Sequence, residues 1–252
     1  MKTKGTPFFR PYGNEIELHN ESDRREKFSN IDCFVPEKTK ERTQDSIERY
    51  SVNIYLERLS QNKLLRFPVK IRKDECPDFF IFNCDKTTTV LEETAVKSEG
   101  FHMAMTEFEK SPETARLDFD LSKLEKYPLS KGGNKKDLLK PNEEGWNEDL
   151  RETKWTDIIL STINKKTKKL NGPRFKTADK YELLIYSYSY GINIKNALLL
   201  LRKMAVERFN LKSFERNFHC VSVIYDDKLL YDVANEGFIL KEVADKISYS
   251  TE

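Results

Sequence analysis

The order of apolar and polar residues along the chain predicts a mixed α/β domain. Residues 46–62 carry apolar side chains at i, i+3, i+4 and i+7, a spacing typical of an amphipathic helix. Three short runs rich in β-forming residues follow at 64–71, 78–83 and 87–96, and the last two are close enough to form a hairpin. We therefore expect a helix followed by three closely spaced strands.

Regular patterns return in the second half of the chain. A long helical pattern covers 146–170 and is stopped by Asn171, Gly172 and Pro173. The predicted order is α-β-β-β-α-β-α-β, which indicates the α/β class with a mixed central sheet flanked by helices. The later elements of this order are a buried strand at 181–190, a helix at 194–209 and a strand at 218–225, and a further strand at 228–233 is expected to return beside the last one.

Two segments lack such patterns. Residues 1–43 are rich in charge and have little periodicity, so we interpret them as a peripheral, partly ordered arm. Residues 97–145 are also charged, contain Gly and Pro clusters, and lack a long apolar stripe. The sequence therefore predicts one domain at 44–252, interrupted by an irregular insertion at about 97–145.

The composition restricts the class of protein. Of the 252 residues 34% are charged, yet 16 Phe and 11 Tyr provide enough apolar surface for a core. No apolar run approaches the roughly 18 residues that cross a bilayer, and the first residues lack the apolar segment of a secretory signal. We expect a cytoplasmic protein with no membrane partner.

Net charge and cysteine spacing exclude few classes of function. The 44 Lys and Arg residues against 42 Asp and Glu give a net charge of +2, which neither requires nor excludes nucleic acid. The four cysteines show no CxxC or Cys/His spacing, so free thiols are expected rather than a zinc site.

The candidate chemistry lies in two adjacent strands. Asp78 follows Pro77 at the start of one strand, and Glu92 stands in the middle of the next. Paired antiparallel strands can bring these two carboxylates together, and such oxygen ligands are preferred by Mg²⁺. Glu92 and Thr94 share one face of their strand, whereas Glu93 points the other way. The residues alone leave open whether Glu92 finds a buried partner or faces solvent on a half-exposed sheet.

The flanking helices add a carboxylate and several lysines. At 100° per residue, Glu48 lies within about 30° of the centre of the first apolar stripe, so it should point inward. On the later helix Lys166 falls near the centre of the apolar face, Lys169 near its edge and Lys165 further out. A lysine on a buried stripe either extends to the surface or pairs with a buried acid. The lysine run at 165–169 would contact phosphates or form a solvated helix end.

These residues resemble the PD-(D/E)xK nuclease superfamily, which has a restriction-endonuclease-like fold. Its core begins with a helix carrying a Glu and continues with strands bearing Pro-Asp and then Glu-x-Lys. Here Glu48 stands on the first helix, Pro77-Asp78 opens a strand, and Glu92-x-Thr94 lies in the next strand. The resemblance covers roughly residues 46–96 and 147–233.

One position departs from the pattern of that superfamily. Thr94 stands where the lysine is expected, and families that are similar in this respect carry the lysine on a neighbouring helix, which points to Lys166. The resemblance implies that Asp78 and Glu92 hold Mg²⁺ or Mn²⁺, which activates water. Glu48 would then support the metal, and Lys166 would stabilise the charge that develops on phosphorus.

The resemblance implies a metal-dependent nuclease that hydrolyses phosphodiester bonds, with DNA favoured over RNA. Thr94, Lys165 and Lys169 would then contact the substrate. Some members of the superfamily have lost catalysis and kept only the fold. A catalytically inactive module that binds nucleic acid or a protein partner is therefore the alternative, and a homodimer is compatible with both.

Overall fold

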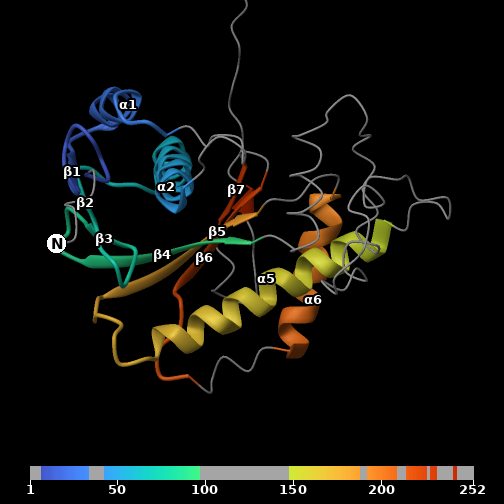
Figure 1. Cartoon of the computed structure of the whole chain (residues 1–252). Coiled ribbons are helices and arrows are strands. Elements are labelled where there is room, and N and C mark those ends of the chain that lie inside the picture. The colour runs from blue at the N-terminus through green and yellow to red at the C-terminus, as the bar shows by residue number, and fades with distance from the viewer. Residues whose placement is uncertain are drawn as a thin grey trace, which may run out of the picture.

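The computed structural model describes residues 7–33, 43–96, 148–187, 192–208, 214–225, 228–231 and 241–242. Its strands form one sheet in the order β1-β2-β3-β4-β5-β6-β7-β8 (Figure 1). These strands are β1 (Glu15–Leu18), β2 (Val69–Lys73), β3 (Phe79–Phe82), β4 (Thr88–Val96), β5 (Lys180–Ser187), β6 (Cys220–Tyr225), β7 (Lys228–Tyr231) and β8 (Lys241–Glu242).

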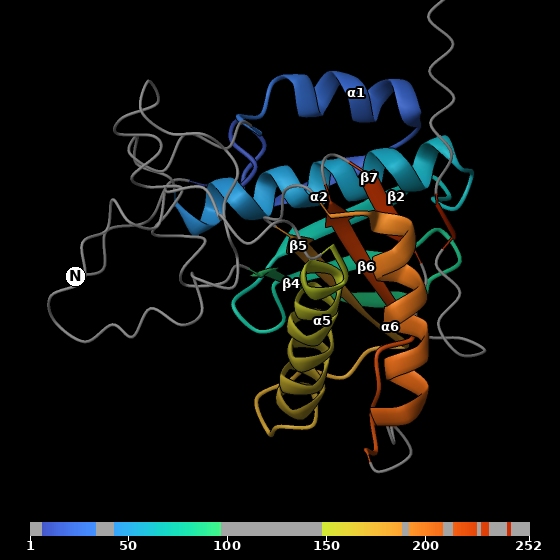
Figure 2. The same ribbon diagram turned by 90° about the vertical axis from the view of Figure 1, so that its right-hand side faces the viewer.

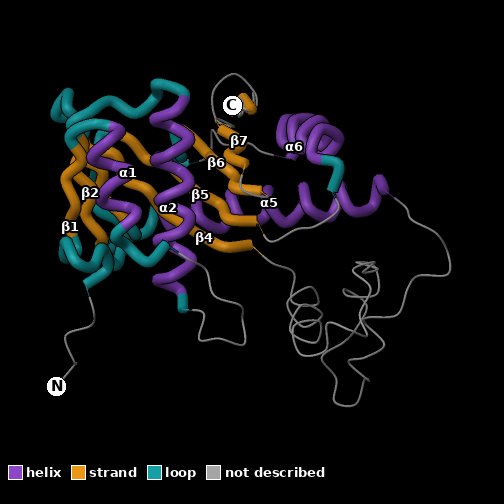
Figure 3. The backbone as a smooth tube through the Cα atoms, turned by 90° about the horizontal axis from the view of Figure 1, so that it is seen from above, coloured by secondary structure: helices purple, strands orange, loops and turns teal. Residues whose placement is uncertain are grey.

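Helices cover both faces of this sheet. Helices α1 (Glu21–Ser29) and α2 (Gln44–Gln61) lie on one face, and α2 crosses the central strands (Figure 3). Helices α5 (Glu148–Leu170) and α6 (Ile194–Arg208) lie side by side on the other face (Figure 2). In the described parts of the chain, no helix is long and apolar enough to cross a membrane.

The sheet is mixed, as the sequence predicts. Strands β1 to β4 pair antiparallel, β4, β5 and β6 pair parallel, and β7 and β8 return antiparallel. The parallel connections pass through α5 and α6, because a parallel pair needs a crossover and cannot be joined by a tight turn. The α/β class with a mixed sheet is confirmed, and the described elements from α2 to β6 follow one another as predicted, with residues 97–147 outside the description.

The segment predicted as a peripheral arm needs correction where the structure describes it. Within 1–43, residues 7–33 include β1 and α1, and β1 forms the edge of the sheet beside β2. Phe9 is fully buried, with its ring centroid 6.5 Å from that of Phe79. Two inward side chains in a four-residue strand are too few to produce a recognisable period. The predicted insertion at about 97–145 lies outside the described residues.

Most element boundaries lie within three residues of the predicted ones. Helix α2 begins two residues early because Thr43 caps it: its side chain accepts a hydrogen bond from the Ser46 backbone (3.1 Å), and the Ser46 hydroxyl accepts one from the Thr43 backbone (3.2 Å). Strand β2 starts later than the predicted 64–71, because Leu64 belongs to the turn that follows α2.

The sheet separates two hydrophobic cores. Alternate side chains of β4 enter different cores, so that Val90 packs with residues of α5 and α6, whereas Leu91 packs with residues of α2. Strand β4 is buried on both faces because helices cover both sides of the parallel part of the sheet. The consecutive residues Glu92 and Glu93 of β4 must therefore also point to opposite faces of the sheet.

Candidate active site

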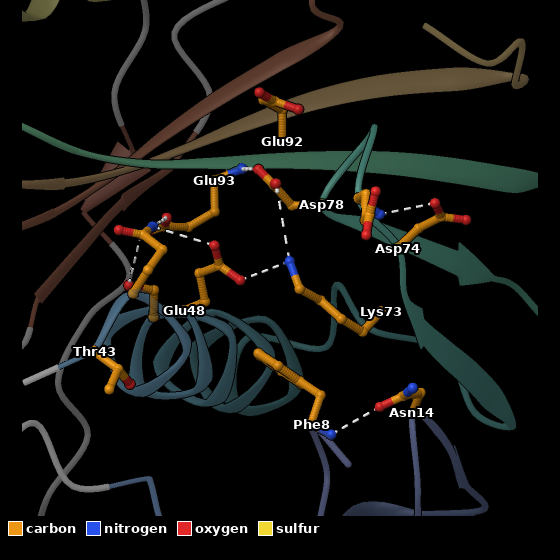
Figure 4. Close-up of polar contacts among 12 residues, drawn as sticks. Phe8, Asn14, Thr43, Glu48, Lys73, Asp74, Asp78, Glu92 and Glu93 are labelled. Carbon is orange, nitrogen blue, oxygen red and sulfur yellow. Dashed lines mark hydrogen bonds and ion pairs between the residues drawn. The ribbon is translucent and has the colours of Figure 1, made fainter. Parts of the chain in front are cut away.

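Two consecutive glutamates of β4 are buried on opposite faces of the sheet. Glu92 points toward the α5 side and Glu93 toward α2 (Figure 4). Their exposed fractions are 0% and 2%. The predicted alternation of the two side chains is confirmed, and the alternative that Glu92 faces solvent is excluded.

Lysines of α5 provide the partners of Glu92. The Lys166 Nζ lies 2.8 Å from Glu92 Oε1 and also donates to the Glu93 carbonyl oxygen at 3.1 Å. Lys169 Nζ donates to the same Glu92 oxygen. Lys166 is turned inward because it follows buried Ile163 by one helical turn. It therefore pairs with a buried acid instead of extending to solvent.

The Glu92 site keeps one acceptor without a partner. Glu92 Oε2 is buried and accepts no hydrogen bond from any described residue. Burial alone would lower the pKa of Lys169, but its hydrogen bond to Glu92 and the charge of that carboxylate raise the pKa overall. Lys169 is therefore protonated at neutral pH, and the oxygen without a partner remains free for another cation.

Asp78 directly precedes β3, which runs beside the strand that carries Glu92. Phe79 pairs with Leu91 in the antiparallel ladder. Asp78, which precedes Phe79, therefore comes opposite Glu92, which follows Leu91. Asp78 Oδ2 accepts a hydrogen bond of 2.8 Å from the Glu93 backbone. Burial and the negative charge of Glu92 raise the pKa of Asp78 to about 6. The charge of Glu92 therefore acts on the Asp78 carboxyl group, although Glu92 points to the other side of β4 from the Lys73 ammonium that lies near Asp78 (Figure 4).

Glu48 points inward as predicted, but it lies on the other side of the sheet from Glu92. Its Oε2 atom lies 2.6 Å from Lys73 Nζ, and the same ammonium lies 3.9 Å from Asp78 Oδ1 (Figure 4). Lys73 therefore lies between Glu48 and Asp78 and links the two carboxylates. Glu48 is not brought to Glu92, which corrects the prediction that both contribute to one metal site.

Glu93 forms the second acid on the α2 side. Its carboxyl group accepts hydrogen bonds from Ser51 Oγ (3.1 Å) and Gln44 Nε2 (3.4 Å). Burial, followed by the negative charge of Glu48, raises the pKa of Glu93 to about 8. Glu93 is therefore mostly protonated at neutral pH, which leaves the Glu48–Lys73 pair electrically balanced.

The remaining predicted site residues make no polar contact with this cluster. Thr94 is half-buried and Lys165 is exposed, and no interaction joins either one to the acids in the described ranges. Sequence reasoning missed Lys73 as a member of the site. Its signal is the alternation of β2, because Lys73 follows buried Val69 and Ile71 on the face that packs under α2.

Asp78 and Glu92 are the candidate ligands of a divalent cation. Within the described ranges, no group of three or more His, Cys, Asp or Glu side chains is arranged to hold a metal ion. Mg²⁺, however, is commonly held by one or two carboxylates together with water and substrate phosphates. Asp78 and Glu92 supply that pair, and the free Glu92 oxygen provides a ligand atom.

This geometry combines two carboxylates, Asp78 and Glu92, with two ammonium groups of α5 that contact Glu92. Carboxylates are typical ligands of a divalent cation, and ammonium groups are typical partners of an anion. Comparisons with known proteins add no family to this description: no family model matches the chain, and neither a curated protein nor a solved structure is significantly similar to it.

Proposed function

We propose that the protein is a metal-dependent nuclease whose reaction centre contains Asp78, Glu92 and Lys166. The contact between Lys166 and Glu92 is the observation that carries the proposal. It brings a lysine of α5 to the acid of the Glu-x-Thr segment, where the resemblance expects an ammonium group. The succession of α2, β2, β3, β4, α5 and β5 is also the order expected of a restriction-endonuclease-like core.

Asp78 and Glu92 would hold the Mg²⁺ or Mn²⁺ of this centre. When bound, the cation would activate water and reduce the negative charge on the phosphoryl oxygens. Asp78 must be ionised to bind it, and its pKa of about 6 leaves it mostly ionised at neutral pH. The hydrogen bond from the Glu93 backbone fixes Asp78 Oδ2, and Asp78 Oδ1, which lies 3.9 Å from Lys73 Nζ, would supply the ligand atom.

Lys166 and Lys169 would stabilise the charge that develops on the phosphoryl group. Lys166 is held by two acceptors, so its ammonium is oriented before the substrate arrives. The Lys169 side chain is 45% exposed and lies where the substrate can reach it. Because these two cations balance Asp78 and Glu92, a divalent cation would make the centre positive and attract a phosphodiester.

A cleavage assay on the full chain tests this function. Labelled single- and double-stranded DNA and RNA are incubated with Mg²⁺, Mn²⁺ or EDTA, and Glu92→Gln is the matched inactive variant. We expect products from DNA only when metal is present and none from Glu92→Gln. Binding without metal-dependent cleavage would favour the alternative of a catalytically inactive module, which the lack of a three-ligand group in the described ranges also favours.

A further inference from the structure

A row of three cations, Lys70, Arg72 and Lys176, lies on the face of β2 and β3 that is turned away from α2. Lys176 comes from the segment between α5 and β5. In β2, Ile71 packs into the α2 core, so Lys70 and Arg72 point to the opposite face. In β3, Phe80 and Phe82 share that opposite face. Helices α5 and α6 lie beneath β4 to β6, further across the sheet (Figure 1). Lys70 and Arg72 are half-buried on this face, whereas Phe80 is buried and packs with the core on the α5 side.

Two phenylalanine rings form the floor of the row. Phe80 and Phe82 stack with their ring centroids 6.2 Å apart and their planes 18° from parallel. The Arg72 Cζ atom lies 5.1 Å and 5.2 Å from the two centroids. Lys70 Nζ lies 5.5 Å from the Phe82 centroid, and Lys176 Nζ lies 5.5 Å from that of Phe80. Three cations thus cover two rings, with Arg72 in the middle.

Arg72 differs from its neighbours in charge pairing. Lys70 pairs with Glu15 at 2.9 Å, and Lys176 pairs with Asp74 at 2.7 Å. The Arg72 guanidinium has no carboxylate or hydrogen-bond partner in the described part of the chain, and its recorded contacts are with the two rings. A guanidinium that stacks on rings keeps its N–H donors at its edge, where they match the oxygens of a phosphate.

The row continues into the proposed reaction centre. Arg72 pairs with Phe80, which pairs with Val90, so the three share one line across the sheet. Glu92 lies two residues further along β4 on the same face. Two strand spacings of about 4.8 Å and two residue rises of about 3.4 Å separate Arg72 from Glu92, roughly 12 Å in total.

We propose that Arg72 binds a backbone phosphate of the nucleic acid strand that enters the reaction centre. Lys70 and Lys176, with side chains 42% and 52% exposed, would contact the neighbouring phosphates. Arg72 would therefore contact a phosphate a few nucleotides from the bond that is cut, because successive phosphates of one strand lie farther apart than the axial rise of about 3.4 Å. This inference rests on the proposed nuclease function and deepens it, since it names the path of the substrate.

Binding of a fluorescent oligonucleotide in EDTA, where metal-dependent cleavage is blocked, tests this path. Affinity is measured against salt concentration for wild type, Arg72→Gln and the control Arg25→Gln, whose side chain is 68% exposed on α1. Loss of one phosphate contact should lower the slope of log K against log salt by about 0.7 to 0.9 and weaken binding several-fold. The control should match wild type.

The double variant Lys70→Gln/Lys176→Gln gives an independent result if Arg72→Gln fails to fold, since both lysines are exposed. It should also lower the salt slope. A wild-type slope and affinity in both sets of variants would overturn the phosphate path, whereas continued metal-dependent cleavage by wild type would leave the nuclease proposal intact. A wild type that neither binds nor cleaves nucleic acid would overturn both.

Discussion

At the scale of single residues, the surroundings of Glu92 and Glu93 give two identical side chains different chemistry. Glu92 is paired with two ammonium groups, whereas Glu93 meets a hydroxyl, an amide and a second acid. The first arrangement stabilises a buried negative charge, and the second favours a neutral carboxyl group. A cation would therefore compete with lysines at Glu92, and it would have to displace a proton at Glu93.

The raised pKa of Glu93 predicts a pH-dependent stability. Its pKa is about 4.5 for an unperturbed glutamate and about 8 in the folded protein, so the folded state binds a proton that the unfolded state releases. The free energy of unfolding should fall as the pH rises from about 4.5 to 8. Asp78 adds a fall of the same sign between 3.8 and about 6.

Glu93→Gln should remove the larger part of this fall. The gain in unfolding free energy above about pH 8 should reach a few kcal/mol, because each pKa unit corresponds to about 1.4 kcal/mol. Urea unfolding of wild type and variant at about pH 5, 7 and 9 measures the difference. A variant with the same pH dependence as wild type would show that Glu93 is ionised in the folded state.

Lys166→Ala should reduce cleavage by about a hundredfold or more, since that is the cost of removing one preorganised donor. Lys168→Ala is the matched control, because Lys168 is exposed on the same helix. Initial rates at saturating metal compare the two variants, and thermal melts check that both are folded. Equal losses of rate would contradict the role assigned to Lys166.

At the scale of elements, α2, β4 and α5 deliver most of the site, and their patterns are readable in the sequence. Each has a long apolar stripe or a run of β-forming residues, so the positions of Glu48, Glu92 and Lys166 could be predicted. The alternation of β2 gives the face on which Lys73 lies, but the partners of Glu93 and Lys73 could not be predicted, because they depend on which elements cover β4 and β2. Local periodicity does not contain that information.

The cap of α2 supports the α2 side of the site. Thr43→Ala should lower the free energy of unfolding by about 1 kcal/mol, because it removes the acceptor of the capping box. Thr43→Ser keeps that acceptor and should remain close to wild type. Urea unfolding of the three proteins decides the matter, and equal stability of the alanine and serine variants would mean that the cap does not hold the helix.

At the scale of the whole molecule, the sheet divides the acids into two groups that share Asp78. The α5 side holds Glu92 with Lys166 and Lys169, and the α2 side holds Glu48 and Glu93 with Lys73. The sequence predicted one convergent set, in which Glu48 supports the metal held by Asp78 and Glu92. It could not predict the division, because this results from the pairing of β3 with β4 and from the helices on both faces.

Calorimetric titration of Mn²⁺ into wild type, Glu92→Gln and Glu93→Gln tests the central claim most directly, because the two substitutions are adjacent and alter opposite faces. Our account predicts that wild type and Glu93→Gln bind Mn²⁺, and that Glu92→Gln binds at least about tenfold more weakly, a difference of about 1.4 kcal/mol. Binding that is lost in Glu93→Gln but kept in Glu92→Gln, or no binding by wild type, would contradict it.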